Sequence, residues 1–239
     1  SDVCSSDLNS SASTTTTFTP ISSLSLSILY TANLSTEVKD IAGNDLDSAY
    51  SFSFTIPWTK QIGTLENDYA YGITTDLSGN IYMSGSTYGS FDNTTNSGFS
   101  DLFVTRIDDN GSLSWTREAG TIAVDIAYSI TTDSSGNIYV AGATNGNLDN
   151  NTNTSAWPLG SGTSNRDICI MKYDKDGMKQ WTGWGLGSQS YDEAFSIVSD
   201  SSNNLYITGN VNGHLDEKFD GERNYNLDGG DVFVAKYNP

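Results

Sequence analysis

The chain has 239 residues, and its 29 Asp and Glu against 11 Lys and Arg give a formal net charge of −18. Such a charge repels nucleic-acid phosphates and anionic membrane surfaces, so we expect neither nucleic acid nor a membrane as a partner. No apolar stretch is long enough to cross a bilayer, which predicts no membrane insertion by these residues.

The first eight residues, SDVCSSDL, resemble the translation of a common sequencing adapter. We therefore expect residues 1–8 to be an artefact at a contig edge, and we leave them out of fold reasoning. Cys4 falls within them, so Cys169 stands alone in the remaining chain and no intramolecular disulfide is expected.

Residues 9–57 end in an alternating segment, YSFSFTI, which places Tyr50, Phe52 and Phe54 on one face of a predicted strand. This strand and the letters VKDIAGNDL before it resemble the C-terminal part of a bacterial Ig-like domain. The resemblance implies a truncated β-sandwich. Half a sandwich cannot cover its own inner face, so we expect residues before Pro57 to be poorly ordered or awkwardly packed.

The rest of the chain repeats itself three times. From Asp68, Asp125 and Asp192 it reads DYAYGITTDLSGNIYMSGSTYGSFD, DIAYSITTDSSGNIYVAGATNGNLD and DEAFSIVSDSSNNLYITGNVNGHLD. A second shared phrase follows each: DLFVTRIDDNGSLSWT, DICIMKYDKDGMKQWT and DVFVAKYNP. Self-similarity at a fixed period predicts one supersecondary unit stacked on copies of itself, at about 58–114, 115–180 and 181–239.

Each unit is predicted to contain four strands, which in the middle copy lie at 128–132, 138–144, 168–173 and 178–182. Gly, Asn, Asp and Ser separate these β-branched and aromatic runs, as tight hairpin turns require. No window has a useful 3.6-residue apolar period, so we predict no substantial helix. Runs such as IYVAG are apolar on both parities, which favours a sheet covered on both faces, as in a β-propeller blade. A parallel β-helix is the main alternative.

Four residue types recur in every copy, and we expect all four to form a structural signature. We expect the Asp to cap the following turn, the Gly to permit close strand approach or a bulge, and the Trp to pack between blades in the fourth strand. This signature consists of Asp76, Asp133 and Asp200; Tyr82, Tyr139 and Tyr206; Gly85, Gly142 and Gly209; and Trp58, Trp115 and Trp181.

In order, these phrases resemble the bacterial SBBP family of β-propeller repeats, over residues 58–239. Departures are small: Phe91 stands where the pattern has Leu, Cys169 where it has Phe, and Asn203 where it has Gly. The resemblance implies an all-β fold, a partial β-propeller of three four-stranded blades belonging to a larger propeller, after the truncated sandwich. It implies no particular enzymatic activity.

Residues with catalytic or metal-binding chemistry are sparse, so we expect no enzyme and no cofactor. His214 is the single His, and Cys169 aligns with the core positions Phe103 and Phe233. Calcium is the metal alternative, because Asp174, Asp176 and the segments LDNNTN and LDEKFDGE offer hard oxygen ligands. The D-x-D-G spacing is nevertheless too short for a helix-flanked calcium loop.

The connections between the two shared phrases vary in length: 9, 18 and 15 residues separate Asp92 from Asp101, Asp149 from Asp167, and Asp216 from Asp231. Variable loops on a fixed scaffold favour binding, and Trp157 in the middle loop is a candidate contact. We therefore expect an interaction or adhesion module of an exported, surface-associated bacterial protein, located extracellularly or on the outer surface, with an unknown protein or glycan partner.

Three other functions stay open from sequence alone. Propellers can host paired carboxylates of a carbohydrate-active enzyme, and five Glu lie outside the repeat pattern: Glu66, Glu118, Glu193, Glu217 and Glu222. The phrase D-x-D-G-x-x-x-W resembles the docking repeat of quinone-dependent dehydrogenases, in one apt copy. A structural spacer without any ligand is the remaining alternative.

Overall fold

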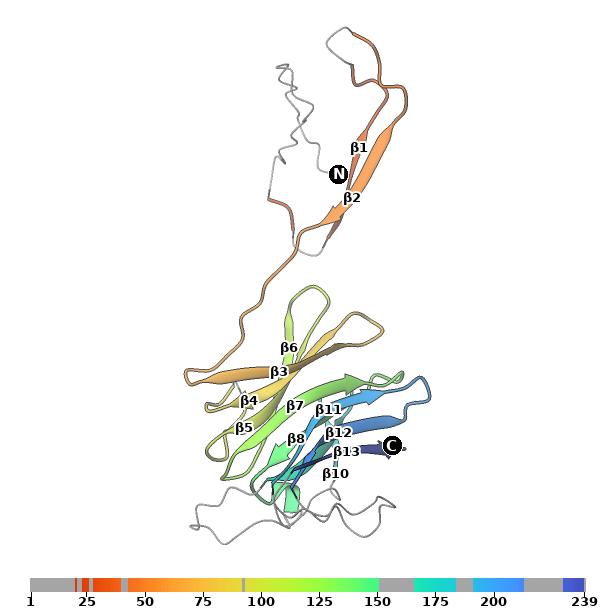
Figure 1. Ribbon diagram of the computed structural model, residues 1–239. Helices are drawn as coiled ribbons and strands as arrows, with labels where there is room; N and C mark the ends of the chain where they lie inside the picture. Colours follow the sequence, from red (N-terminus) through yellow and green to blue (C-terminus); the bar gives the residue numbers. More distant parts are fainter. Residues whose placement is uncertain are drawn as a thin grey trace. The chain divides into compact units, whose positions relative to one another are not determined.

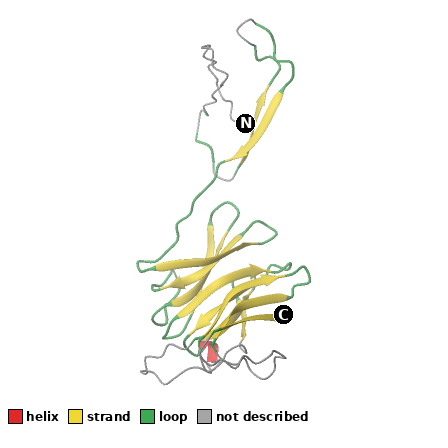
Figure 2. Cartoon of the chain, viewed as in Figure 1, coloured by secondary structure: helices red, strands yellow, loops and turns green. Residues whose placement is uncertain are grey.

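The computed structural model describes residues 20, 23–25, 28–39, 43–91, 93–150, 166–183, 191–212 and 230–238 (Figure 1). The chain divides into two compact units, Ser1–Lys60 and Gln61–Pro239. Strands dominate the described residues, which hold one short 3₁₀ turn, Leu148–Asn150, and no α-helix (Figure 2). They contain no helix with the length and apolar character that spanning a bilayer requires.

Unit 1 contains an antiparallel hairpin of β1 (Leu29–Leu34) and β2 (Tyr50–Thr55). The alternation in β2 gathers its three aromatic rings on one face, where the ring centroids of Tyr50 and Phe52 are 6.1 Å apart and those of Phe52 and Phe54 are 6.0 Å apart. All three rings are exposed. A two-stranded sheet has no second layer with which to bury such a face.

Unit 2 consists of three antiparallel sheets that follow the three sequence copies. The first two sheets have four strands in the order β3-β4-β5-β6 and β7-β8-β9-β10, and the third has three, β11-β12-β13. Their bounds are β3 Asp68–Thr75, β4 Ile81–Thr87, β5 Asp101–Ile107, β6 Leu113–Ala119, β7 Asp125–Thr132, β8 Ile138–Thr144, β9 Asp167–Tyr173, β10 Lys179–Gly183, β11 Asp192–Ser199, β12 Leu205–Val211 and β13 Asp231–Tyr237.

This arrangement confirms the predicted all-β fold of stacked propeller blades, with one correction. The expectation of four strands per blade holds for the first two sheets, whereas the described residues of the third sheet form three strands. The first strands lie next to one another, since β7 contacts both β3 and β11 (Figure 1). Adjacent first strands are what blades arranged around a common axis produce.

The middle sheet is buried on both faces, and side-chain parity decides which neighbour covers which face. Ile138 and Val140 pack with first-sheet residues such as Leu102, whereas Tyr139 and Ala141 pack with third-sheet residues such as Ile207; these contacts belong to two separate apolar clusters. Every residue of β8 is buried. Each large apolar side chain so buried contributes about 1.5–3 kcal/mol, which explains why IYVAGAT is apolar at successive positions.

A β-bulge recurs in the first strand of each of the three sheets of unit 2, and the signature glycines lie opposite it. The register shifts between Ala70 and Gly72, between Ala127 and Ser129, and between Ala194 and Ser196. The partner residues are Gly85, Gly142 and Gly209. A Cβ on these glycines would lie 1.8–1.9 Å from a carbonyl oxygen of the bulged strand, so a side chain cannot be accommodated there.

We predict that Gly142→Ala lowers the free energy of unfolding by about 2–4 kcal/mol, because its Cβ would meet the Ile126 carbonyl oxygen at 1.8 Å. Urea denaturation would measure the loss. Gly136→Asn is the matched control, because Asn203 adopts the same left-handed conformation (φ 65°) in the third copy; it should cost less than about 1 kcal/mol. Equal losses in the two variants would contradict the steric explanation.

Candidate functional site

Unit 2 has two ends, which we call the turn end and the loop end. The turn end carries the hairpin turns 76–80, 133–137 and 200–204, and the loop end is where β3, β7 and β11 begin. The connections of variable length leave from the loop end, after Thr87, Thr144 and Val211.

The signature Asp and Tyr lock the turns at the turn end. One carboxylate oxygen of Asp133 accepts hydrogen bonds from the backbone N–H groups of Ser135 and Asn137, both 2.9 Å. The other accepts from the Asn137 side chain at 2.8 Å and from the Tyr139 hydroxyl at 3.0 Å. The other two copies repeat this set of four bonds, around Asp76 and around Asp200.

Electrostatics agree with this structural role. Burial alone would raise the pKa of Asp133, but hydrogen bonds from Asn137, Tyr139 and Ser135 outweigh burial and hold the pKa below 3.8. Burial and the bond to Asp76 raise the pKa of Tyr82 to about 12, so its hydroxyl stays a donor at neutral pH. Four donors occupy both oxygens of each carboxylate, which leaves little capacity for a ligand.

Two of the three signature Trp residues lie where blades meet. Trp115 in β6 packs against the cluster between the first and second sheets, with its ring centroid 6.2 Å from that of Tyr82. Trp181 in β10 packs in the same way against the next cluster, 6.2 Å from Tyr139. The prediction that Trp58 also lies in a fourth strand is wrong, because Trp58 is outside every strand.

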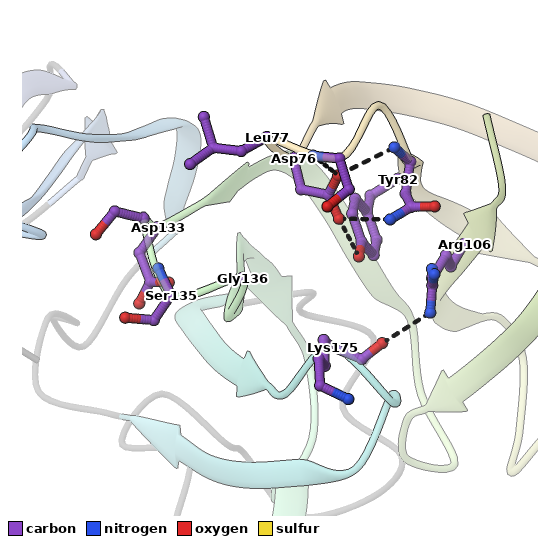
Figure 3. Close-up of a pocket in the computed structure, with 11 residues that line it drawn as sticks. Asp76, Leu77, Tyr82, Arg106, Asp133, Ser135, Gly136 and Lys175 are labelled. Carbon is purple, nitrogen blue, oxygen red and sulfur yellow. Dashed lines mark hydrogen bonds between the residues drawn. The ribbon is translucent and has the colours of Figure 1, made fainter.

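A polar pocket of about 440 Å³ opens at the turn end between the first two sheets, and Figure 3 shows its lining. Asp76 and Asp133 face it, but both are bonded within their own turns (Figure 3). Arg106 donates to the Lys175 carbonyl oxygen at 3.4 Å (Figure 3). At the next junction the Asn203 side chain accepts from the backbone and hydroxyl of Ser134. Gly136 is the second copy's counterpart of Asn203, and it has no side chain with which to bridge to the first sheet. The pocket lies at this position.

A different cluster at the loop end breaks the repeat pattern. Glu193 stands where the other copies have Tyr69 and Ile126, and Arg166 stands where the first copy has Ser100. The two form an ion pair with side chains 9% and 19% exposed. The Glu193 carboxylate also accepts from the hydroxyls of Tyr128 (2.8 Å) and Tyr191 (3.1 Å).

Further bonds tie this cluster into one unit. Arg166 donates to the Tyr128 hydroxyl at 3.0 Å, and its guanidinium lies 5.2 Å from the ring centroid of Tyr191. Burial, and then the bond to Glu193, raise the pKa of Tyr128. Sequence reasoning singled out Glu193 as a departure from the pattern but missed its neighbour Tyr191 and the residues Arg166 and Tyr128, which other segments bring to it.

Six aromatic rings lie along the first strands and the loop end, and each contacts the next. We call them the aromatic row. Successive ring centroids along it are 5.4–6.5 Å apart. The rings are, in order, Phe99, Tyr88, Tyr69, Tyr71, Tyr128 and Phe195. All but Tyr128 are 40–62% exposed. Tyr71, Tyr128 and Phe195 are the bulged residues of their strands, so the recurring D-x-A-[YF] phrase was the available signal.

Several of the described carboxylates are buried or engaged in contacts within the protein. Asp101 is fully buried, Glu193 is paired with Arg166, and Glu66 is exposed. One oxygen of Glu118 accepts from the Phe91 N–H at 2.6 Å. Across the described ranges no three His, Cys, Asp or Glu gather as metal ligands would.

The proposed calcium ligands on described residues are engaged in local contacts. Asp174 accepts from the backbone N–H groups of Asp176 (3.0 Å) and Met178 (2.9 Å), and so caps a hairpin. Asp176 bonds Lys175, and Asp149 bonds Lys179 at 2.5 Å. Calcium binding stays an untested prediction.

Several predicted residues lie outside the described residues, namely Trp157, His214, Glu217 and Glu222. Cys169 is described, and it is buried as a free thiol in the cluster between the first two sheets. Burial raises its pKa, so it is a poor nucleophile and serves as a small core residue.

Comparisons with known proteins agree with this geometry. A family model described as a beta-propeller repeat (SBBP) matches residues 58–92 and 114–149, and one for a bacterial Ig-like domain matches residues 1–56. The chain thus carries both kinds of module. It is also 26% identical over 219 residues to an uncharacterized WD repeat-containing protein of Acanthamoeba polyphaga mimivirus. That match spans 77% of this chain and 16% of the viral protein.

We predict that Asp133→Asn lowers the free energy of unfolding at pH 7 by about 1–3 kcal/mol, because an amide NH₂ would face the donors of Asn137 and Tyr139. The lowered pKa means that the carboxylate stabilises the fold above pH 4 and stops doing so at lower pH, so the difference from wild type should shrink in acid. Asp176→Asn, at an exposed ion pair, should cost less than about 0.5 kcal/mol.

The opposite pH dependence is expected at Asp101. Burial raises its pKa to about 6, and the carboxylates of Asp125 and Glu118 add to the rise. The folded state therefore holds the proton more tightly, and ionisation costs stability as pH rises from about 4 to 6. Asp101→Asn should gain on the order of 2 kcal/mol relative to wild type between pH 4 and pH 7. A difference that is flat with pH in denaturation curves would contradict this.

Proposed function

We propose that this chain is a non-catalytic interaction module that serves adhesion in an exported, surface-associated bacterial protein, with a protein or glycan as its partner. Beta-propeller repeats and bacterial Ig-like domains suggest protein-interaction or structural modules, which supports the coarse part of the proposal. Fold alone does not specify function, so the finer part rests on the surface of unit 2.

The observation that carries the proposal is where the non-repeated side chains lie. The carboxylate oxygens of the repeated Asp residues accept hydrogen bonds within their own turns. In contrast, the departures Arg166 and Glu193 lie at the loop end, next to the exposed aromatic row. Contiguous exposed apolar surface with Tyr hydroxyls and a nearby Arg is typical of interaction sites.

The non-catalytic part of the proposal is supported by the state of two described carboxylates. Glu193 is held by three donors, and the buried carboxylate of Asp101 has no access to solvent. A rigid, hydrogen-bonded cluster beside exposed rings is suited to holding a ligand, not to transferring a proton to one.

We predict that the fluorescently labelled chain binds at least one member of an array of extracellular-matrix proteins and glycans. Unlabelled chain should compete for that signal, and heat-denatured chain should give none. Absence of any competed signal would favour the spacer alternative and reject the proposal. Turnover of chromogenic glycosides by the same purified protein would contradict the non-catalytic assignment.

A further inference from the structure

Resting on the proposed function, we propose that the aromatic row binds an extended, Lys- or Arg-rich segment of a partner protein through cation–π contacts. The row presents five rings that are each at least 40% exposed, three on the first strands β3 and β11 and two, Tyr88 and Phe99, in the connection after β4. Aromatic faces attract cations, and each exposed contact of this kind adds measurably to affinity. Three observations point to a cationic partner.

First, the described Lys and Arg side chains of unit 2 already have contacts within the protein. All seven of its described Lys and Arg contact a carboxylate, a backbone carbonyl or an aromatic ring. These residues are Arg106, Arg117, Arg166, Lys172, Lys175, Lys179 and Lys236. Among the described residues none is left over to cover the aromatic row.

Second, this chain holds several of its own cations over aromatic faces. Arg117 lies 5.2 Å from the ring centroid of Trp115, and Lys172 lies 5.2 Å from that of Tyr139. Lys236 lies 5.5 Å from that of Tyr206. No described Lys or Arg lies over a ring of the aromatic row. Its faces are therefore open to cations from another molecule.

Third, the charge of unit 2 favours a cationic partner. Residues 61–239 contain 23 Asp and Glu against 9 Lys and Arg. Such an excess raises the local concentration of cationic ligands and speeds their association, in a way that salt weakens. The electrostatic field thus brings cations toward the surface, and the rings give them defined positions.

Ring orientation favours a peptide over a neutral glycan. The planes of Tyr88 and Phe99 cross at 67°, those of Tyr71 and Tyr128 at 61°, and those of Tyr128 and Phe195 at 62°. A row of crossed rings offers separate faces to separate side chains. A sugar chain stacks best on coplanar rings, and along the row only Tyr69 and Tyr71, whose planes differ by 14°, have that arrangement.

The test measures binding of a fluorescein-labelled peptide of alternating Lys and Gly by fluorescence anisotropy, at low and high salt. A Tyr71→Ala/Phe195→Ala double variant removes two exposed rings, and Tyr71→Phe keeps the ring while removing the hydroxyl. Leu77→Ala, at an exposed apolar residue of the turn end, controls for location. A peptide with Gln in place of Lys controls for charge, and circular dichroism checks that each variant is folded.

We expect the double variant to bind the Lys peptide about 5- to 30-fold more weakly than wild type. The Tyr71→Phe and Leu77→Ala variants should stay within about twofold of wild type, and the Gln peptide should bind far more weakly than the Lys peptide. Equal binding by the double variant and wild type would overturn the inference, because bulk charge would then explain the affinity.

Two further outcomes separate this inference from the proposed function. If cello-oligosaccharides bind in a ring-dependent way and the Lys peptide does not, the cationic partner is wrong while an interaction module remains. If array ligands bind equally well to the double variant, the proposed function stands and the aromatic row is not its site. Ring-dependent binding of the Lys peptide, together with weaker binding of an array ligand by the double variant, supports the inference.

Discussion

Burial of both faces of a sheet is the constraint from which the rest of unit 2 follows. A strand such as β8, apolar at successive positions, cannot exist at the edge of a two-layer fold, because one parity would face water. Neighbouring copies solve this by covering one parity each, with Ile138 and Val140 on one side and Tyr139 and Ala141 on the other. Stacking then aligns the first strands, and everything at the loop end depends on that alignment.

Once the sheets are stacked, repetition separates structural residues from candidates for binding. The Asp–Asn–Tyr lock recurs with distances that agree within about 0.2 Å among copies, so it is a property of the hairpin. Differences between copies have local consequences instead. Asn203 bridges to Ser134 at one junction, and Gly136 leaves a pocket at the other. Glu193 recruits Arg166 and two Tyr hydroxyls at a position where the other copies have Tyr69 and Ile126.

Strand positions could be predicted from the sequence because local signals specify them. The predicted strand at 138–144 coincides with β8, since Gly and Asn mark the turn before it and a run of apolar residues fills it. The cluster at the loop end could not be predicted, because Tyr128 and Glu193 are 65 residues apart and meet only when first strands align. The prediction that Trp58 lies in a strand failed for a related reason. Its local phrase matches those of Trp115 and Trp181, but a strand also needs a neighbouring strand with which to pair.

The bulge connects the scaffold to the surface. A glycine without Cβ lets each first strand admit one extra residue, and that residue is Tyr71, Tyr128 or Phe195. The bulge recurs at the same register in each sheet. Stacking of the sheets therefore places the centroids of successive bulged rings 5.4–5.5 Å apart. The scaffold thus supplies the spacing of the rings, while residues that vary between copies, such as Tyr69 and Glu193, supply the chemistry around them. Side chains at these varying positions can therefore differ between copies while the bulge and its glycine stay the same.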